Sequence, residues 1–124
     1  MKAGKNLLIV DDNEKNIFAL KAVLKVRGYH CMQATSAAAG LKILQNDTGI
    51  DLVLLDMMMP DMDGYEMVNI MKNDNRIKQI PVIAVTAQAM TGDKEKCLKA
   101  GVNAYITKPI NIDALIEEIV SLIP

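Results

Sequence analysis

The chain has 124 residues, of which 51% are hydrophobic, and its formal net charge at pH 7 is −1. A chain of this length has the usual size of one domain and can bury roughly two-thirds of its unfolded surface. The near-zero charge gives no reason to expect nucleic acid or an anionic membrane as a partner, and no apolar run approaches the ~20 residues that span a bilayer. The N-terminus also lacks the apolar core of a signal peptide, so we expect one cytoplasmic domain over residues 1–124.

Short apolar segments alternate with segments of helical periodicity. In chain order, we expect a strand at 6–11, a helix at 13–27, a strand at 29–34, a helix at 37–46, a strand at 51–55, a helix at 65–73, a strand at 80–85, a helix at 91–99, a strand at 102–106 and a last helix that Asn111 caps and that extends through Val120. Gly28 is expected to stop the first helix. Gly40 lies inside the second helix, where it should cost roughly 1 kcal/mol relative to alanine.

This alternation predicts an α/β fold, with a parallel sheet covered by helices on both faces and with right-handed crossovers. The doubly wound, flavodoxin-like strand order 2-1-3-4-5 suits five strands and places the switch point between the first and third strands. Ligands of such sheets bind just beyond the carboxyl ends of the strands. The cysteines Cys31 and Cys97 have no metal-binding or redox spacing, so we expect two free thiols.

Three aspartates lie where the first and third strands end. Asp11 and Asp12 follow LLIV, and Asp56 follows DLVLL. One of the first two could merely cap the next helix, but Asn13 can do this instead. Carboxylates about 4 Å apart repel by on the order of 4 kcal/mol per pair at an effective dielectric constant near 20, so such a cluster needs a cation or a proton. Mg²⁺ suits it, since this ion binds carboxylates and completes its shell with water and phosphate oxygens.

Asp56 could serve there as a metal ligand or as a nucleophile that forms an aspartyl phosphate. The single histidine, His30, begins the second strand, away from this crevice, and we interpret it as structural. A phosphohistidine donor would therefore belong to another protein or domain. The acidic segment 61–64 lacks the ligand spacing of a calcium-binding loop, and we interpret it as a turn.

Thr86 lies at the carboxyl end of the fourth strand, and Lys108 lies at the carboxyl end of the fifth strand. Both are on the same rim as Asp56. Each has an ordinary interpretation, because threonine favours strands and lysine is usually solvated. At this rim, however, the lysine could pair with Asp56 and later with phosphoryl oxygens, and the threonine hydroxyl could donate to the same oxygens. A cis bond before Pro109 would fix a tight turn that directs Lys108 inward.

Together these residues closely resemble the receiver domain of two-component response regulators and hybrid histidine kinases. The resemblance covers nearly the whole chain and depends on four motifs in the expected order: LLIVDDN (7–13), DLVLLDMMMPDMDG (51–64), PVIAVTA (81–87) and AYITKPI (104–110). It implies that Asp56 is the phospho-acceptor. It also implies that Asp11, Asp12, Asp56 and the backbone carbonyl of Met58 bind Mg²⁺.

The resemblance further implies that Thr86 is the switch hydroxyl, that Lys108 binds the phosphoryl group and that the Lys108–Pro109 bond is cis. Tyr105 matches the aromatic switch position, although it could simply pack on the sheet edge. The surface of the last two helices and the last strand would then change for a partner to read. The implied partner is a histidine kinase or a histidine-containing phosphotransfer domain. The segment 84–110 resembles receivers of hybrid kinases or single-domain regulators, and we expect no direct binding of nucleic acid and no membrane contact by this domain.

The sequence disfavours two other functions. A Mg²⁺-dependent phosphohydrolase generally needs a second acid two residues after its nucleophile, and that position is Met58. A nucleotide or flavin binder would need a glycine-rich loop after the first strand, where residues 12–14 are Asp-Asn-Glu. We therefore predict a switch rather than an enzyme. Met58 and Gln88 flank the crevice, and Gln88 could orient a water that hydrolyses the aspartyl phosphate.

Overall fold

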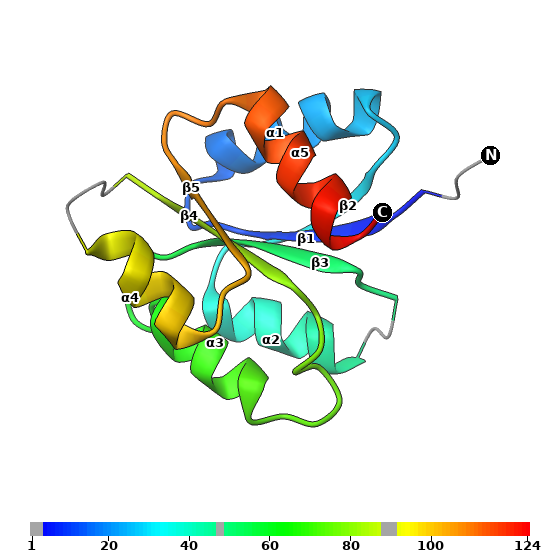
Figure 1. Cartoon of the computed structure of the whole chain (residues 1–124). Helices are drawn as coiled ribbons and strands as arrows, with labels where there is room; N and C mark the ends of the chain where they lie inside the picture. The colour runs from blue at the N-terminus through cyan, green and yellow to red at the C-terminus, as the bar shows by residue number, and fades with distance from the viewer. Residues whose placement is uncertain (1–3, 47–48, 88–91) are drawn as a thin grey trace.

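The structure is a computed structural model that describes residues 4–46, 49–87 and 92–124. Strands and helices alternate along this part of the chain, as the sequence predicts, and Figure 1 labels them. They are β1 (Asn6–Val10), α1 (Glu14–Val26), β2 (His30–Ala34), α2 (Ala37–Asn46), β3 (Leu52–Asp56), α3 (Gly64–Lys72), β4 (Val82–Thr86), α4 (Asp93–Ala100), β5 (Ala104–Thr107) and α5 (Ile112–Leu122).

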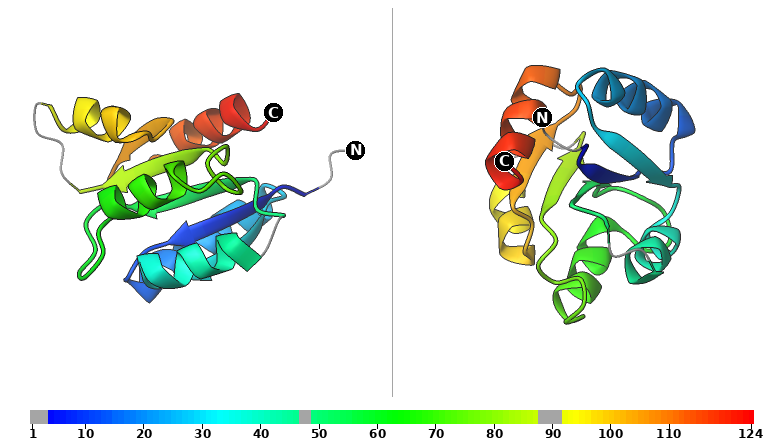
Figure 2. Two further views of the ribbon diagram at one scale, coloured as in Figure 1. Left: turned by 90° about the horizontal axis from the view of Figure 1, so that it is seen from below. Right: turned by 90° about the vertical axis from the view of Figure 1, so that its right-hand side faces the viewer.

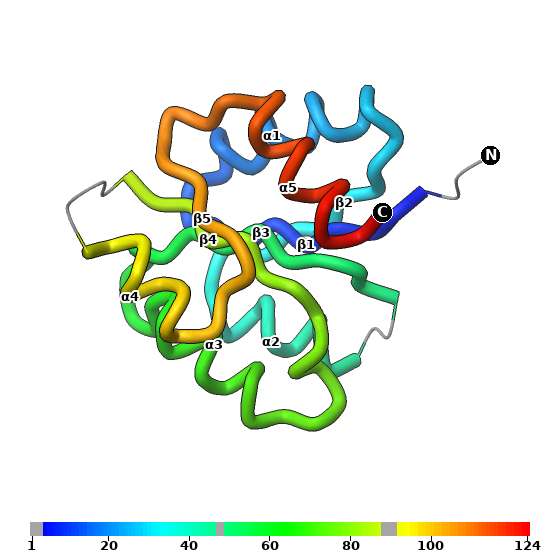
Figure 3. The backbone as a smooth tube through the Cα atoms, in the orientation of Figure 1, coloured from blue at the N-terminus to red at the C-terminus, as the bar shows by residue number. Residues whose placement is uncertain are grey.

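The five strands form one parallel sheet in the order β2-β1-β3-β4-β5, which confirms the predicted doubly wound topology. Helices α1 and α5 cover one face of the sheet, and α2, α3 and α4 cover the other (Figures 1 and 2). The backbone trace in Figure 3 passes from β1 to its neighbour β2 and then crosses to β3 on the opposite side of β1. The carboxyl ends of β1 and β3 are therefore adjacent.

Each face of the sheet has its own apolar core. Successive residues of β1 alternate between them: Leu7 and Ile9 pack with α1 and α5, whereas Leu8 and Val10 pack with the other three helices. All five residues of β3, and all five of β4, are buried. This burial on both faces explains why these strands are continuous apolar runs in the sequence. No helix in the described ranges is long and apolar enough to cross a membrane.

The predicted boundaries lie within two residues of the observed ones, and both ends of α2 agree. The third and fourth strands end one residue later than predicted, at Asp56 and Thr86, so both polar side chains belong to the sheet rather than to the loops after it. The fourth strand begins at Val82, because Pro81 has no N–H to donate and contributes only its carbonyl, which accepts from Val53 at 3.0 Å. Gly28 follows α1 with φ of 93°, in the left-handed region where glycine is favoured, as expected for a helix stop.

Gly40 is explained by the packing of α2 on the sheet. A Cβ atom at this position would lie 2.9 Å from Cγ2 of Val10 and 3.1 Å from Cε of Met67. We therefore expect Gly40→Ala to lower the free energy of unfolding by about 1 kcal/mol, because overpacking outweighs the gain in helix propensity. Urea denaturation measures this effect. In the Val10→Ala background, which opens the space, Gly40→Ala should be neutral or stabilising; a stabilised Gly40→Ala single variant would contradict the packing argument.

Candidate functional site

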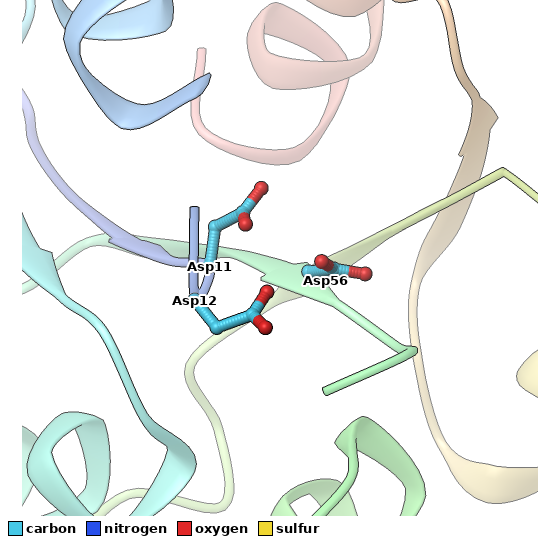
Figure 4. Close-up of side chains that lie close together, drawn as sticks. All are labelled: Asp11, Asp12 and Asp56. Carbon is cyan, nitrogen blue, oxygen red and sulfur yellow. The ribbon is translucent and has the colours of Figure 1, made fainter. Parts of the chain in front are cut away.

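The carboxyl ends of β1 and β3 bring three aspartates together. Val10 pairs with Leu55 in the sheet, so Asp11 and Asp56 occupy equivalent positions on neighbouring strands. Figure 4 shows Asp11 and Asp12 where β1 ends, with Asp56 beside them. Carboxylate oxygens of all three residues lie within 4.8 Å of one another. Asp11 and Asp56 are buried, whereas Asp12 is exposed, so the cluster opens to solvent on one side.

Both buried aspartates are fixed by the backbone that follows them. Asp11 Oδ1 accepts from the N–H of Asn13 at 2.8 Å, and Asp56 Oδ1 accepts from the N–H of Met58 at 3.0 Å. Asn13 is the N-cap of α1, since its Oδ1 accepts from the N–H groups of Lys15 (2.9 Å) and Asn16 (3.1 Å). Neither aspartate is therefore used to cap the helix, and the second oxygen of each faces the crevice.

Lys108, in the turn between β5 and α5, lies close to both buried carboxylates. Its Nζ lies 3.5 Å from Asp11 Oδ2 and 3.5 Å from Asp56 Oδ2. Its backbone N–H donates to the carbonyl of Thr86 at 2.8 Å, and its peptide bond to Pro109 is cis. Thr86 is 3% exposed at the end of β4, the strand next to Asp56. The Lys108 ammonium thus offsets part of the repulsion among the three carboxylates.

The environment of Asp56 disfavours its charged form. Burial raises the pKa of the Asp56 carboxyl, and the neighbouring Asp11 raises it further; the Met58 N–H and Lys108 oppose both effects without cancelling them. The ionised site therefore favours an additional cation. Carboxylate oxygens are the donors that Mg²⁺ prefers, so the three aspartates fit this ion.

This raised pKa predicts the stability of an Asp56→Asn variant. Because the pKa of Asp56 is higher in the folded protein than in the unfolded chain, the ionised carboxylate lowers the free energy of unfolding. This destabilisation is complete at pH values above the folded pKa, and it disappears as the pH falls to the ordinary carboxyl pKa of about 3.9. Without Mg²⁺ at pH 7.5, Asp56→Asn should stabilise the protein by about 1–2 kcal/mol, or about 4–8 °C in Tm. Thermal unfolding at pH 7.5 and pH 4 measures this difference.

The exposed Asp61 provides the control for this prediction. Its φ of 64° lies in the left-handed region, which asparagine also tolerates, so Asp61→Asn should leave Tm nearly unchanged at both pH values. An Asp56→Asn variant that is no more stable than wild type at pH 7.5 would contradict the expected cost of the buried charge.

The turn that contains Asp61 leads into α3, which Asp63 caps by accepting from the Glu66 N–H at 3.0 Å. This geometry agrees with a turn at 61–64 rather than a calcium loop.

Tyr105 lies on β5, half-buried against the core layer of α2, α3 and α4. The sequence did not predict its surroundings. The hydroxyl of Tyr65 and the thiol of the buried Cys97 are 3.4 Å apart, and Lys96 Nζ lies 4.5 Å from the centre of the Tyr65 ring. Burial raises the pKa of Tyr105, and Asp93 adds to this effect. The contact between Tyr65 and Cys97 joins α3 to α4 across 32 sequence positions, and no motif or periodicity of the sequence indicates it.

The remaining candidate residues lie elsewhere. His30 begins β2, at the end of the sheet opposite to the aspartates, as expected. Cys31 is half-buried and Cys97 buried, and both thiols are free, which confirms that prediction. Gln88 lies outside the described residues. Met58 is 51% exposed next to the acidic cluster.

Three comparisons with known proteins agree with this geometry. The sequence profile of the response regulator receiver domain matches residues 7–120. The polar-differentiation response regulator DivK of Brucella ovis is 38% identical over 117 residues, which cover 94% of each chain.

Solved structures give the same result. The Francisella response regulator 1452 receiver domain superposes with a TM-score of 0.88 at 30% identity, over 96% of each chain. The signal receiver domain of a histidine kinase from Syntrophus aciditrophicus superposes with a TM-score of 0.86 at 29% identity, over 96% of this chain and 89% of that one. With the strand order, the acidic cluster and the matched residues in agreement, the chain belongs to the response regulator receiver domain family of two-component signalling.

Proposed function

We propose that this receiver domain, over residues 1–124, accepts a phosphoryl group on Asp56 from a partner phosphohistidine and then changes a protein-interaction surface. The observation that carries the proposal is the constellation at the strand ends. Carboxylate oxygens of three aspartates lie within 4.8 Å of one another, and Lys108 is 3.5 Å from two of these residues. Such a site is suited to a phosphoryl group, because its oxygens can pair with the lysine while a cation held by the carboxylates would offset the remaining negative charge.

Asp56 is a better nucleophile for this reaction than Asp11 because of its place in the sheet. It lies on β3, between the acidic end of β1 and the Thr86 end of β4. As in Asp11, one carboxylate oxygen is held by a backbone N–H, here that of Met58, which leaves Asp56 Oδ2 facing Lys108 and the crevice. This carboxylate oxygen would attack phosphorus, forming an O–P bond while the P–N bond to the partner histidine breaks and its electron pair returns to the imidazole.

The residues that would hold Mg²⁺ are Asp11, Asp12, Asp56 and the backbone carbonyl of Met58. When bound, the ion neutralises charge on the transferring phosphoryl group and orients it. Lys108 supplies the remaining fixed cation of the crevice. The opening beside the exposed Asp12 would give the partner's phosphohistidine access to the crevice. The buried Asp11 and Asp56 are held in position by the backbone N–H groups that they accept.

The switch would follow from the new charge. A phosphoryl group adds about −1.5 to −2 charges, which draw Lys108 and the Thr86 hydroxyl toward it, and Tyr105 would turn into the space that Thr86 leaves. Moving an equilibrium from 1:99 to 99:1 needs about 5.5 kcal/mol, and two or three charge-assisted hydrogen bonds at about 1.5–3 kcal/mol each can supply it. The face formed by α4, β5 and α5 would then be the surface that a partner reads.

Histidine kinases phosphorylate response regulator receiver domains, so a histidine kinase or a histidine-containing phosphotransfer domain is the proposed donor. The similarity to both the regulator DivK and a histidine-kinase receiver supports either a single-domain regulator or a segment of a hybrid kinase. We place this reaction in the cytoplasm. The domain would assist its own phosphoryl transfer and hydrolysis without turning over a separate substrate.

The test is to incubate the chain with Mg²⁺ and a small acyl-phosphate donor and to measure its mass. We expect a gain of one phosphoryl group, no gain with excess EDTA, and loss of the group under hydroxylamine, which cleaves acyl phosphates. Peptide mapping after reduction by borohydride should locate the label at Asp56. A label on another residue would remove the proposed assignment. Sustained hydrolysis of phosphomonoesters would instead favour the phosphohydrolase.

The lifetime of the aspartyl phosphate gives a separate prediction. The Met58 side chain is 51% exposed beside Asp56 but has no group that can orient a water molecule. Met58→Asn should therefore shorten the half-life about tenfold, which corresponds to about 1.4 kcal/mol in the barrier, whereas Gln88→Ala should lengthen it. Mass spectrometry after removal of the donor measures the decay. Met58→Leu is the matched control, and unchanged half-lives in Met58→Asn and Gln88→Ala would exclude both residues from this role.

A further inference from the structure

A second concave surface lies at the edge of the sheet, formed by the outer side of α1 and the edge strand β2. This groove has a volume of about 730 Å³. We call it the α1–β2 groove; its lining includes Glu14, Phe18, Lys21, Lys25, Cys31 and Gln33. Within the described part of the chain, β2 pairs only with β1 and has no strand on its other side. The aspartate cluster contributes no residue to it.

The free side of β2 presents backbone groups to the groove. The His30 N–H donates to the Lys5 carbonyl at 2.9 Å, and the Ala34 carbonyl accepts from the Asp11 N–H at 3.1 Å, so alternate residues from His30 onward face β1. Successive residues of a strand direct their N–H and C=O groups to opposite sides. The backbone groups of Cys31 and Gln33 therefore point away from the sheet. Such an edge can pair with a further extended segment.

The side chains over this edge are apolar and basic. Phe18, the only phenylalanine of the chain, is 77% exposed at the groove. Lys21 and Lys25 line the same groove against a single acid, Glu14, although the whole chain carries a net charge of −1. Lys21 Nζ donates to the Gln33 side chain at 2.9 Å across the edge, a contact that an incoming carboxylate can replace. The groove therefore combines a positive charge with an unoccupied aromatic surface.

We propose that the α1–β2 groove binds an extended, acidic segment of a partner protein, which adds to the sheet beside β2. Backbone pairing with Cys31 and Gln33 would supply affinity. Side chains of such a segment alternate between the two faces, so apolar residues at every second position would pack on Phe18 while neighbouring acids reach Lys21 and Lys25. This surface is separate from Asp56, so the segment would bind whether or not Asp56 is phosphorylated.

A library of random heptapeptides displayed on phage is the probe, with the full chain as the target. Enriched peptides should alternate Asp or Glu with apolar residues. In fluorescence anisotropy, they should bind Phe18→Ser and the double variant Lys21→Glu, Lys25→Glu at least tenfold more weakly than wild type. Val26→Ser is the matched control, since Val26 is 85% exposed on the same helix but outside the groove. In ¹⁵N NMR spectra, the amide signals of Cys31 and Gln33 should shift on binding.

Several results would overturn this proposal: no enrichment, enriched peptides without acidic residues, equal affinity for the Phe18→Ser variant, or amide shifts confined to another face. Sedimentation that shows a dimer in wild type and a monomer in Phe18→Ser would assign the groove to a second copy of the chain instead. Labelling of both groove variants by the acyl-phosphate donor at the wild-type rate would establish that they are folded. This control also separates failure of the groove from failure of the Asp56 assignment.

Discussion

Replacement of Asp56 by asparagine should abolish phosphoryl uptake, with a loss of on the order of a thousandfold or more in labelling rate. Asparagine keeps the shape of the side chain and can still accept the Met58 N–H that holds Asp56 Oδ1 at 3.0 Å. It has no anionic oxygen to attack phosphorus, and it removes one of the three carboxylates proposed to hold Mg²⁺. The measurement is intact-mass spectrometry with Mg²⁺ and an acyl-phosphate donor over time.

The neighbouring carboxylates separate the two functions of Asp56. Asp12→Asn should weaken labelling through loss of a Mg²⁺ ligand, so high Mg²⁺ should restore part of the rate. Asp56→Asn should not recover at any Mg²⁺ concentration, because the nucleophile itself is missing. If Asp56→Asn gains the phosphoryl mass at the wild-type rate, Asp56 is not the acceptor. This outcome would leave the family assignment intact, since that depends on the whole chain.

The sequence predicts those parts of the site that follow from local patterns, namely the positions of Asp11, Asp56 and Asn13 at the ends of strands and at the start of a helix. A short apolar run between turn signals is typical of a strand buried on both faces, and parallel strands bring their carboxyl ends to one edge. These two rules place Asp11 and Asp56 side by side. The cap at Asn13 was likewise predictable, because a short polar side chain before a helix accepts backbone N–H groups.

Contacts across the fold were not predictable in this way. The pairing of Lys108 with Asp56 is an exception, because the sequence predicts both residues on the same rim, but the equal 3.5 Å distance from Lys108 to Asp11 depends on the turn between β5 and α5 and on a long flexible side chain. The amphipathic pattern of the first helix identifies the buried Ile17 and Leu24 but cannot assign a function to the exposed Phe18. Exposed residues have no period to match, so only the position of α1 beside the free edge of β2 shows what surrounds them.

Replacement of Lys108 by alanine should tighten Mg²⁺ binding about tenfold while it abolishes the conformational response to phosphorylation. The Lys108 ammonium lies within 3.5 Å of both buried carboxylates, where it competes electrostatically with an added cation. Removing the ammonium should make the binding free energy of a divalent ion in this partly solvated site more favourable by about 1–2 kcal/mol, which lowers Kd about tenfold. Calorimetric titration with Mg²⁺ measures the first effect. The amide signals of β5 and α4, compared before and after labelling, measure the second.

The two effects have opposite signs, and this distinguishes a phosphate-binding lysine from a lysine that merely stabilises the fold. A structural lysine would weaken both functions when removed. Lys108→Arg keeps the charge, so it should retain Mg²⁺ affinity near the wild-type value, although its planar group fits the crevice differently and should give only part of the response. Lys42→Ala, which removes an exposed lysine of α2, should change neither measurement. Weaker Mg²⁺ binding in Lys108→Ala would contradict the expected competition between Lys108 and the ion. A full shift of the β5 signals on labelling of this variant would show that Lys108 does not transmit the phosphoryl charge to the α4–β5–α5 face.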